Sequence, residues 1–287
     1  MRHLTITTRH WRLYNPEEYS GPVDVERTFD LDRTAFVTLH IWNVGFTDGP
    51  EYPTDRFAPF MCTPEDTEIM HQVVEEIIVP CLEVAREVGM AVCHVELERI
   101  ANKYPKSSYQ WKVTDLPAHM VKWTEDPERL HAQQVKETRG SHEEDLEEPI
   151  PGWWLERAEL VHGPGHRDWE GGEILDRPES CKPMDGEYVI KTTLQFDRIL
   201  RELGIVNLIY VGFTAQGCLL TSEGAVGPMM ERGYRCMVIR EGTHGVEFPD
   251  TRPERLMTKF ALRVVENRYG FTISAADFIN ACRSLKR

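Results

Sequence analysis

Cys218 stands at a point in the chain where a cysteine can act as a nucleophile. It follows an apolar segment at 206–212 and a turn at 213–217 (FTAQG), and it precedes a segment with helical periodicity. A thiol at the N-terminus of a helix lies at the positive end of the helix dipole and near free N–H groups, which favour the thiolate. The same N–H groups are suited to an oxyanion during acyl transfer. The alternative interpretation is a buried cysteine that only packs the start of the helix.

The elements around Cys218 predict an α/β fold in three layers, with a mostly parallel, Rossmann-like sheet. Alternating strands and helices of this length imply right-handed crossovers and a sheet that is covered on both faces. In open sheets of this type, sites form at the carboxyl ends of strands. That rule selects 40–43, 93–96 and 213–218. The apolar segments that we expect to be strands are 35–41, 90–97, 188–190, 206–212, 236–240 and 270–273, and the expected helices are 195–203, 218–231, 252–267 and one that begins at Thr63.

Two parts of the chain depart from this alternation. Residues 1–33 are polar and irregular in pattern, and we expect an N-terminal arm that lies on the domain or on a partner subunit. The remainder, 34–287, is predicted to be a single domain. It is interrupted at about 102–170 by acid-rich stretches, Gly and Pro clusters and several tryptophans. Because linkers rarely carry so many tryptophans, we interpret 102–170 as an ordered insertion that covers the site.

Composition limits the class of protein. The formal charge of −14 argues against nucleic acids and anionic membranes as partners, since both need a basic face. No apolar run approaches the roughly 18 residues of a membrane span, and the N-terminus has no secretory apolar region. The seven cysteines form no CxxC pair, which favours reduced thiols in the cytoplasm. Without a GxGxxG or Walker loop, no organic cofactor is expected.

Several spaced segments agree in order with one known family. The segments 186–191 (GEYVIK), 200–205 (LRELGI), 208–212 (LIYVG), 217–221 (GCLLT) and 232–234 (RGY) together resemble the central part of the isochorismatase-like cysteine hydrolases. That superfamily includes nicotinamidases, N-carbamoylsarcosine amidases and ureidoacrylate amidases. Residues 35–46 are similar to the first strand of the family and its Asn-containing turn. The resemblance covers more than half of the chain and misses the arm and most of 102–168.

The resemblance implies a triad of Asp, Lys and Cys in the isochorismatase-like hydrolase fold. The cysteine attacks an amide carbonyl, and water then hydrolyses the thioester. Cys218 takes the position of the nucleophile and Lys191 that of the lysine. A cis peptide bond is implied at Phe213–Thr214, with the N–H groups of Thr214 and Cys218 as oxyanion donors. Homo-oligomers, dimers or tetramers, are also implied.

The sequence differs from the family at the carboxylate. His40 stands where the family has Asp, in the segment LHIWN at 39–43. One interpretation makes His40 the base of a Cys–His pair. The other makes it a hydrogen-bonded polar residue in a catalytically silent relative that serves as a ligand-binding or structural subunit. Lys191 also stands before a shortened loop, so its ammonium is either a site group or a strand-end cation that reaches solvent.

Further candidates surround these residues. Asn43, Trp42 and Gln216 are expected to contact substrate, although Asn43 would also order its turn and Trp42 would also suit the core. His94 and Glu96 end a strand near the point where nicotinamidases keep metal ligands, and the insertion adds His162 and His166. Alternate residues of a strand share a face by default, so we expect no metal.

The sequence therefore predicts a cysteine-dependent hydrolase. Its expected substrate is a small molecule with a linear amide, ureido or carbamoyl C–N bond, and the particular substrate is not fixed. Vinyl-ether hydrolysis, as in true isochorismatases, is disfavoured because those enzymes lack the nucleophilic cysteine.

Overall fold

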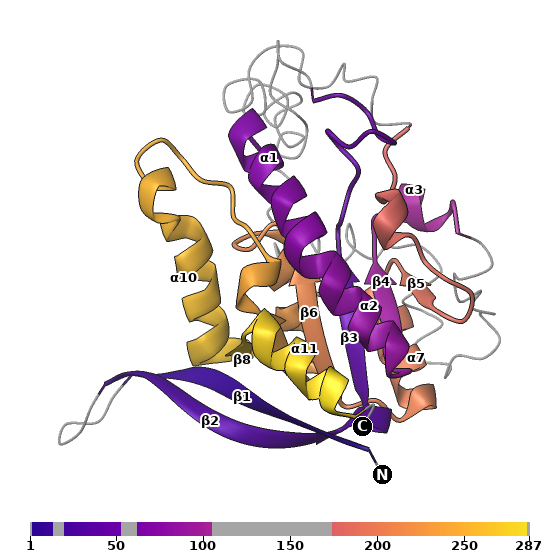
Figure 1. The fold of residues 1–287 in the computed structure, drawn as a ribbon, viewed down its shortest axis with the longest axis vertical. Helices are drawn as coiled ribbons and strands as arrows, with labels where there is room; N and C mark the ends of the chain where they lie inside the picture. Colours follow the sequence, from indigo (N-terminus) through magenta and orange to yellow (C-terminus); the bar gives the residue numbers. More distant parts are fainter. Residues whose placement is uncertain (1, 14–19, 53–61, 105–173, 286–287) are drawn as a thin grey trace, which may run out of the picture. The chain divides into compact units, whose positions relative to one another are not determined.

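The computed structural model describes residues 2–13, 20–52, 62–104 and 174–285, which all belong to one compact unit. They form an eight-stranded sheet in the order β2-β1-β8-β7-β6-β3-β4-β5 (Figure 1). Neighbouring strands from β8 to β5 run parallel, whereas β1 is antiparallel to both β2 and β8. The predicted α/β fold with a mostly parallel sheet is confirmed. The strands are β1 (His3–Arg12), β2 (Gly21–Asp30), β3 (Thr34–Leu39), β4 (Ala91–Val95), β5 (Tyr188–Ile190), β6 (Asn207–Gly212), β7 (Arg235–Ile239) and β8 (Gly270–Ile273).

Helices cover both faces of the sheet and so give three layers. Side chains alternate across each strand, so Phe36 and Val37 of β3 enter opposite apolar clusters. The cluster around Phe36 includes α1 (Pro64–Val73), the π-helical turn Val74–Ile78, α2 (Val79–Glu87) and α11 (Ala275–Ser284). The cluster around Val37 includes α7 (Thr193–Leu203), α8 (Cys218–Thr221), α9 (Val226–Glu231) and α10 (Leu256–Val264), while the short α3 (Glu98–Ala101) follows β4.

Residues 1–33, whose sequence pattern predicted no strand, contain two strands. Their described residues form the β1–β2 hairpin, which pairs over ten residues of each strand and extends the sheet at β8. Leu4, Ile6 and Thr8 are buried while Thr5 and Thr7 between them are exposed, the period of two that a half-buried strand requires. Polar residues dominate the hairpin and obscure this alternation in the sequence. The predicted contact of this segment with a partner subunit stays a prediction.

The prediction of a single helix over 218–231 is wrong. The structure divides it into α8 and α9, and the chain turns between them at Gly224, whose φ is +66°. The Gly224 N–H donates to the Thr193 hydroxyl at 2.9 Å. A side chain at 224 would also press on Val95 and Phe196, at 3.1 and 3.3 Å from the Cβ position. The break shortens the helix that begins at Cys218 to four residues.

The predicted insertion at about 102–170 lies outside the described residues, apart from its first three. Its histidines, His162 and His166, lie outside them as well. Within the described part of the chain, no helix is both long enough and apolar enough to cross a membrane.

Candidate functional site

The paired ends of β3 and β6 bring together the two segments that carry His40 and Cys218. Leu39 is the register partner of Gly212, and the Phe213 N–H donates to the Leu39 carbonyl at 3.0 Å. His40 and the turn before Cys218 therefore begin at the same point on the carboxyl edge of the sheet. This placement follows the strand-end rule from which both were predicted.

His40 and Cys218 line one pocket of about 460 Å³. Besides His40 and Cys218, its described lining holds Cys62, Thr214 and Gly217. Most of the remaining wall is apolar or aromatic and includes Trp42, Phe46, Tyr52, Met70, Leu97 and Phe213. A concave, mainly apolar cavity with a few convergent polar groups is the usual form of a small-molecule site.

Cys218 is the half-buried member of the seven cysteines, and the other six are buried. It begins α8 after a turn in which the Phe213–Thr214 peptide bond is cis, at the position that the resemblance implies. Burial raises the pKa of the Cys218 thiol, and backbone hydrogen bonds at Thr214 and Cys218 oppose that rise only in part. The expected bias toward the thiolate is therefore reversed. A helix of four residues supplies little dipole, and the thiol needs a base to become a nucleophile.

His40 is suited to be that base. Its side chain is 6% exposed and stacks on Trp42, with ring centroids 5.3 Å apart and 22° between the planes. Burial lowers the pKa of His40 to about 4, and the positive charge of Arg177 acts in the same direction. The imidazole is therefore neutral at physiological pH, the form that a base needs, and its low pKa makes it a weak base.

Two further features of His40 are unusual. Its Nδ1 is buried without a hydrogen-bond partner among the described residues. Its φ of +50° is in the left-handed region, which a residue with a side chain rarely adopts. Orphaned polar atoms and strained backbone both occur preferentially at functional sites.

Lys191 is not brought to His40 and Cys218. Its ammonium lies 2.6 Å from a carboxylate oxygen of Glu98 in an exposed ion pair, and it is not among the described residues that line the pocket. The reason is local: β5 ends at Ile190, and Thr192 already caps α7 by accepting the Gln195 N–H. No loop remains to carry Lys191 inward.

The other predicted substrate contacts divide into two groups. Trp42 lines the pocket, and so does Phe213 of the cis peptide bond. Asn43 and Gln216 instead hold the backbone. The Asn43 amide donates to the Asp48 carbonyl at 2.9 Å and accepts the Asp176 N–H at 2.8 Å. The Gln216 amide pairs with both backbone groups of Val246, at 3.1 and 3.2 Å. Neither is among the described residues of the pocket wall.

Arg177 and Glu96 form a buried ion pair beside the site, and sequence reasoning missed Arg177. The Arg177 guanidinium also donates to the Thr38 hydroxyl at 3.0 Å and the Cys181 carbonyl at 2.8 Å. Glu96 accepts the Trp42 indole N–H at 3.0 Å. Arg177 stands in no motif, and its side-chain partners Glu96 and Thr38 are far away in the sequence, so no local signal could have found the pair.

The strand-end pair His94 and Glu96 does not fit a metal ion. Both ring nitrogens of His94 are in hydrogen bonds, to Thr38 at 2.8 Å and Glu187 at 2.7 Å. Glu96 already pairs with a cationic guanidinium, which would repel a metal ion. The described ranges contain no group of three or more His, Cys, Asp or Glu residues arranged to hold a metal.

No protein-family model matches the chain, and no curated protein matches it. Similar solved structures include a cysteine hydrolase from Pseudomonas syringae pv. phaseolicola 1448A, at 12% identity, over 90% of this chain and 95% of that one, with a TM-score of 0.49. An isochorismatase family protein from Desulfovibrio vulgaris subsp. vulgaris str. Hildenborough is 16% identical, over 89% and 99%, with a TM-score of 0.46. N-carbamoylsarcosine amidase from Thermoplasma acidophilum is 15% identical, over 85% and 96%, with a TM-score of 0.40.

Proposed function

We propose that this chain is a cysteine-dependent hydrolase that cleaves a linear amide, ureido or carbamoyl C–N bond through a thioester intermediate. One observation carries the proposal. A half-buried cysteine and a buried, neutral histidine with an unpartnered Nδ1 line the same pocket at adjoining strand ends.

Both groups start uncharged, so the proton moves as the new bond forms. The Cys218 sulfur attacks the carbonyl carbon while His40 accepts the thiol proton. The carbonyl oxygen becomes an oxyanion, for which the N–H groups of Thr214 and Cys218 are the donors. Collapse of the tetrahedral intermediate breaks the C–N bond, and His40 returns its proton to the leaving nitrogen. A water molecule then attacks the thioester while His40 takes its proton. The C–S bond breaks, His40 returns the proton to the Cys218 sulfur, and the acid leaves.

The pocket wall indicates which substrates to test. Its mainly aromatic and aliphatic lining favours an acyl group with an apolar body. Because burial of apolar area contributes about 25 cal/mol per Å², aryl or branched aliphatic amides should bind better than small polar ones.

A silent, ligand-binding relative is the second candidate. The raised pKa of the Cys218 thiol and the pairing of Lys191 with Glu98 both favour it, because a working triad would be expected to activate the thiol. The pocket itself would serve binding equally well.

Ammonia release from a panel of apolar primary amides, N-carbamoyl compounds and ureido compounds separates the two candidates. An active enzyme turns over at least one class, and Cys218→Ala and His40→Ala each abolish or strongly reduce the rate. Binding without turnover, detected as a ligand-induced rise in the melting temperature that persists in Cys218→Ala, supports the silent relative.

A further inference from the structure

A continuous file of buried, hydrogen-bonded polar side chains runs from the amino ends of the strands toward His40 at the carboxyl edge of the sheet. It starts at Glu187, passes through His94 and Thr38 to Arg177, and ends at Glu96. Each successive pair is joined by a hydrogen bond or an ion pair, and every member is at least nine-tenths buried. Burying charges is costly unless each has a partner, so the file acts as one unit that fixes its members in place.

The protonation states along the file follow from the donors available. Although burial opposes it, hydrogen bonds from His94 and Arg86 lower the pKa of Glu187 to about 2, so this carboxylate can only accept. Burial and the charge of Arg177 lower the pKa of His94 to about 4, which leaves one ring proton. That proton must therefore be on Nε2, facing Glu187, and Nδ1 accepts the Thr38 hydroxyl. The Thr38 oxygen then accepts from Arg177.

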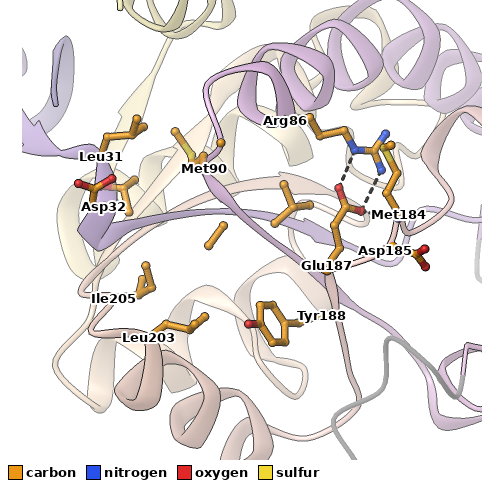
Figure 2. Close-up of a pocket in the computed structure, with 15 residues that line it drawn as sticks. Leu31, Asp32, Arg86, Met90, Met184, Asp185, Glu187, Tyr188, Leu203 and Ile205 are labelled. Carbon is orange, nitrogen blue, oxygen red and sulfur yellow. Dashed lines mark hydrogen bonds and ion pairs between the residues drawn. The ribbon is translucent and has the colours of Figure 1, made fainter.

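The outer end of the file reaches a second pocket, shown in Figure 2, at the amino ends of β3, β4 and β5. There Arg86 donates to both oxygens of Glu187, at 2.7 and 3.0 Å. A bidentate pair of this kind fixes the Glu187 carboxylate. The file is therefore fixed at the amino edge of the sheet, whereas the site lies at the carboxyl edge.

The inner end holds the residues on both sides of His40. Thr38 precedes His40 by two positions and accepts from Arg177. Glu96 accepts from the backbone of Ile41 and from the Trp42 indole, and the Trp42 ring stacks on the His40 imidazole. The Arg177–Glu96 pair is therefore tied to the positions before and after His40.

We propose that Arg177, held by Glu96, is the cation of this site and positions His40 in its neutral form, in place of Lys191. The proposal rests on the role given to His40 in the proposed function. It makes Arg177 a positioning residue, because it acts on His40 and touches no substrate in the mechanism above.

The other charged and titratable groups near His40 do not supply this role. His71 from α1, Arg99 from α3, and the thiols of Cys62 and Cys218 line the same pocket. Of these and Arg177, only Arg177 acts with burial to lower the pKa of His40. The Lys191 ammonium pairs with Glu98 and is not among the charges that shift the pKa of His40.

The test is the titration of His40, followed by NMR of the full chain with isotope-labelled histidine between pH 5 and 8. Wild type should keep His40 neutral throughout. Arg177→Gln should raise the pKa of His40 by about one pH unit or more, the scale of a nearby charge. Arg177→Lys, which keeps the charge, should retain the low value. Lys191→Gln is the matched control and should leave the titration unchanged.

Arg177→Gln leaves the Glu96 carboxylate buried and unpaired, so this variant can fail to fold. The double variant Arg177→Gln/Glu96→Gln keeps amide hydrogen bonds without an unpaired charge and should show the same upward shift. An unchanged His40 titration in either variant overturns the proposal. A shift in Lys191→Gln also overturns it, since Lys191 would then be the cation. The readout needs no turnover, so a chain that hydrolyses nothing can still support the role of Arg177.

Discussion

Leu39 and Gly212 are register partners at the ends of β3 and β6, and a Cβ at position 212 would lie 1.9 Å from the Leu39 carbonyl oxygen. The φ of Gly212 is +130°, which L side chains rarely adopt. Glycine is therefore required at this point for the two strand ends to meet. The approach of His40 to the turn of Cys218 depends on it.

Gly212→Ala should cost about 3 kcal/mol or more in the free energy of unfolding, because the added methyl group meets main chain on the adjacent strand as well as a strained φ. Gly204→Ala is the matched control. Gly204 also has a positive φ, +69°, but nothing lies within 4 Å of its Cβ position. Gly204→Ala should lower the free energy of unfolding by only about 1 kcal/mol. Urea denaturation measures both, and equal losses would contradict the close-approach argument.

His40→Ala should lower the rate of acylation by about 10²-fold or more, the scale of general-base catalysis. Pre-steady-state kinetics on a turned-over amide measures this step. An unchanged rate would remove His40 from the mechanism. His40→Asp introduces the carboxylate that the isochorismatase-like cysteine hydrolases, which the sequence resembles, have at this position. It also places a negative charge near Glu96, so recovery should be partial at most.

The Cys218 thiol should react as a weakly acidic group. Because burial raises its pKa, its alkylation by iodoacetamide should accelerate only above about pH 8.5, the ordinary thiol value. Peptide mass spectrometry follows each cysteine separately. Cys62 in the same pocket is an internal control, since burial raises its pKa to about 12 and it should react more slowly. A thiolate that is already formed near pH 7 would contradict the neutral-pair mechanism.

The buried histidines should make the fold sensitive to acid. His40 and His94 have pKa values of about 4, below the usual 6.5, so the unfolded state binds more protons between these values. Stability should therefore fall as the pH drops from 6.5 to 4, by up to about 3 kcal/mol for each histidine. Glu96, whose pKa burial raises to about 7, offsets part of this. Urea midpoints at pH 5 and 7 should differ in wild type and differ less in His94→Gln. An equal difference in both would contradict the neutral state of His94.

The parallel core of the fold could be predicted because its strands are short, apolar and separated by amphipathic helices. The β1–β2 hairpin could not, since Leu4 and Ile6 are its few apolar markers among threonines and charges. The proximity of His40 and Cys218 follows from topology, because parallel strands end at one edge. The Arg177–Glu96 pair joins residues 81 positions apart, and no local pattern encodes such a contact.

Lys191 shows where a sequence position is not enough. The lysine stands at the end of the expected strand. Thr192 caps α7 directly after it, and the ammonium forms an ion pair with Glu98 from α3. The geometry of one short connection decides where the ammonium lies. The same applies to Gln216. Its amide donates to the Val246 carbonyl, in a loop whose position the sequence does not predict.

The central claim is that Cys218 forms a thioester during turnover. The most direct measurement is intact-mass spectrometry of the full chain, quenched in acid during reaction with an apolar amide or an activated ester of the same acyl group, followed by peptide mapping. The account predicts an added acyl mass on the peptide that carries Cys218. It also predicts slower formation of that adduct in His40→Ala and none in Cys218→Ala. Turnover without any adduct on Cys218, or turnover that persists in Cys218→Ala, would contradict it.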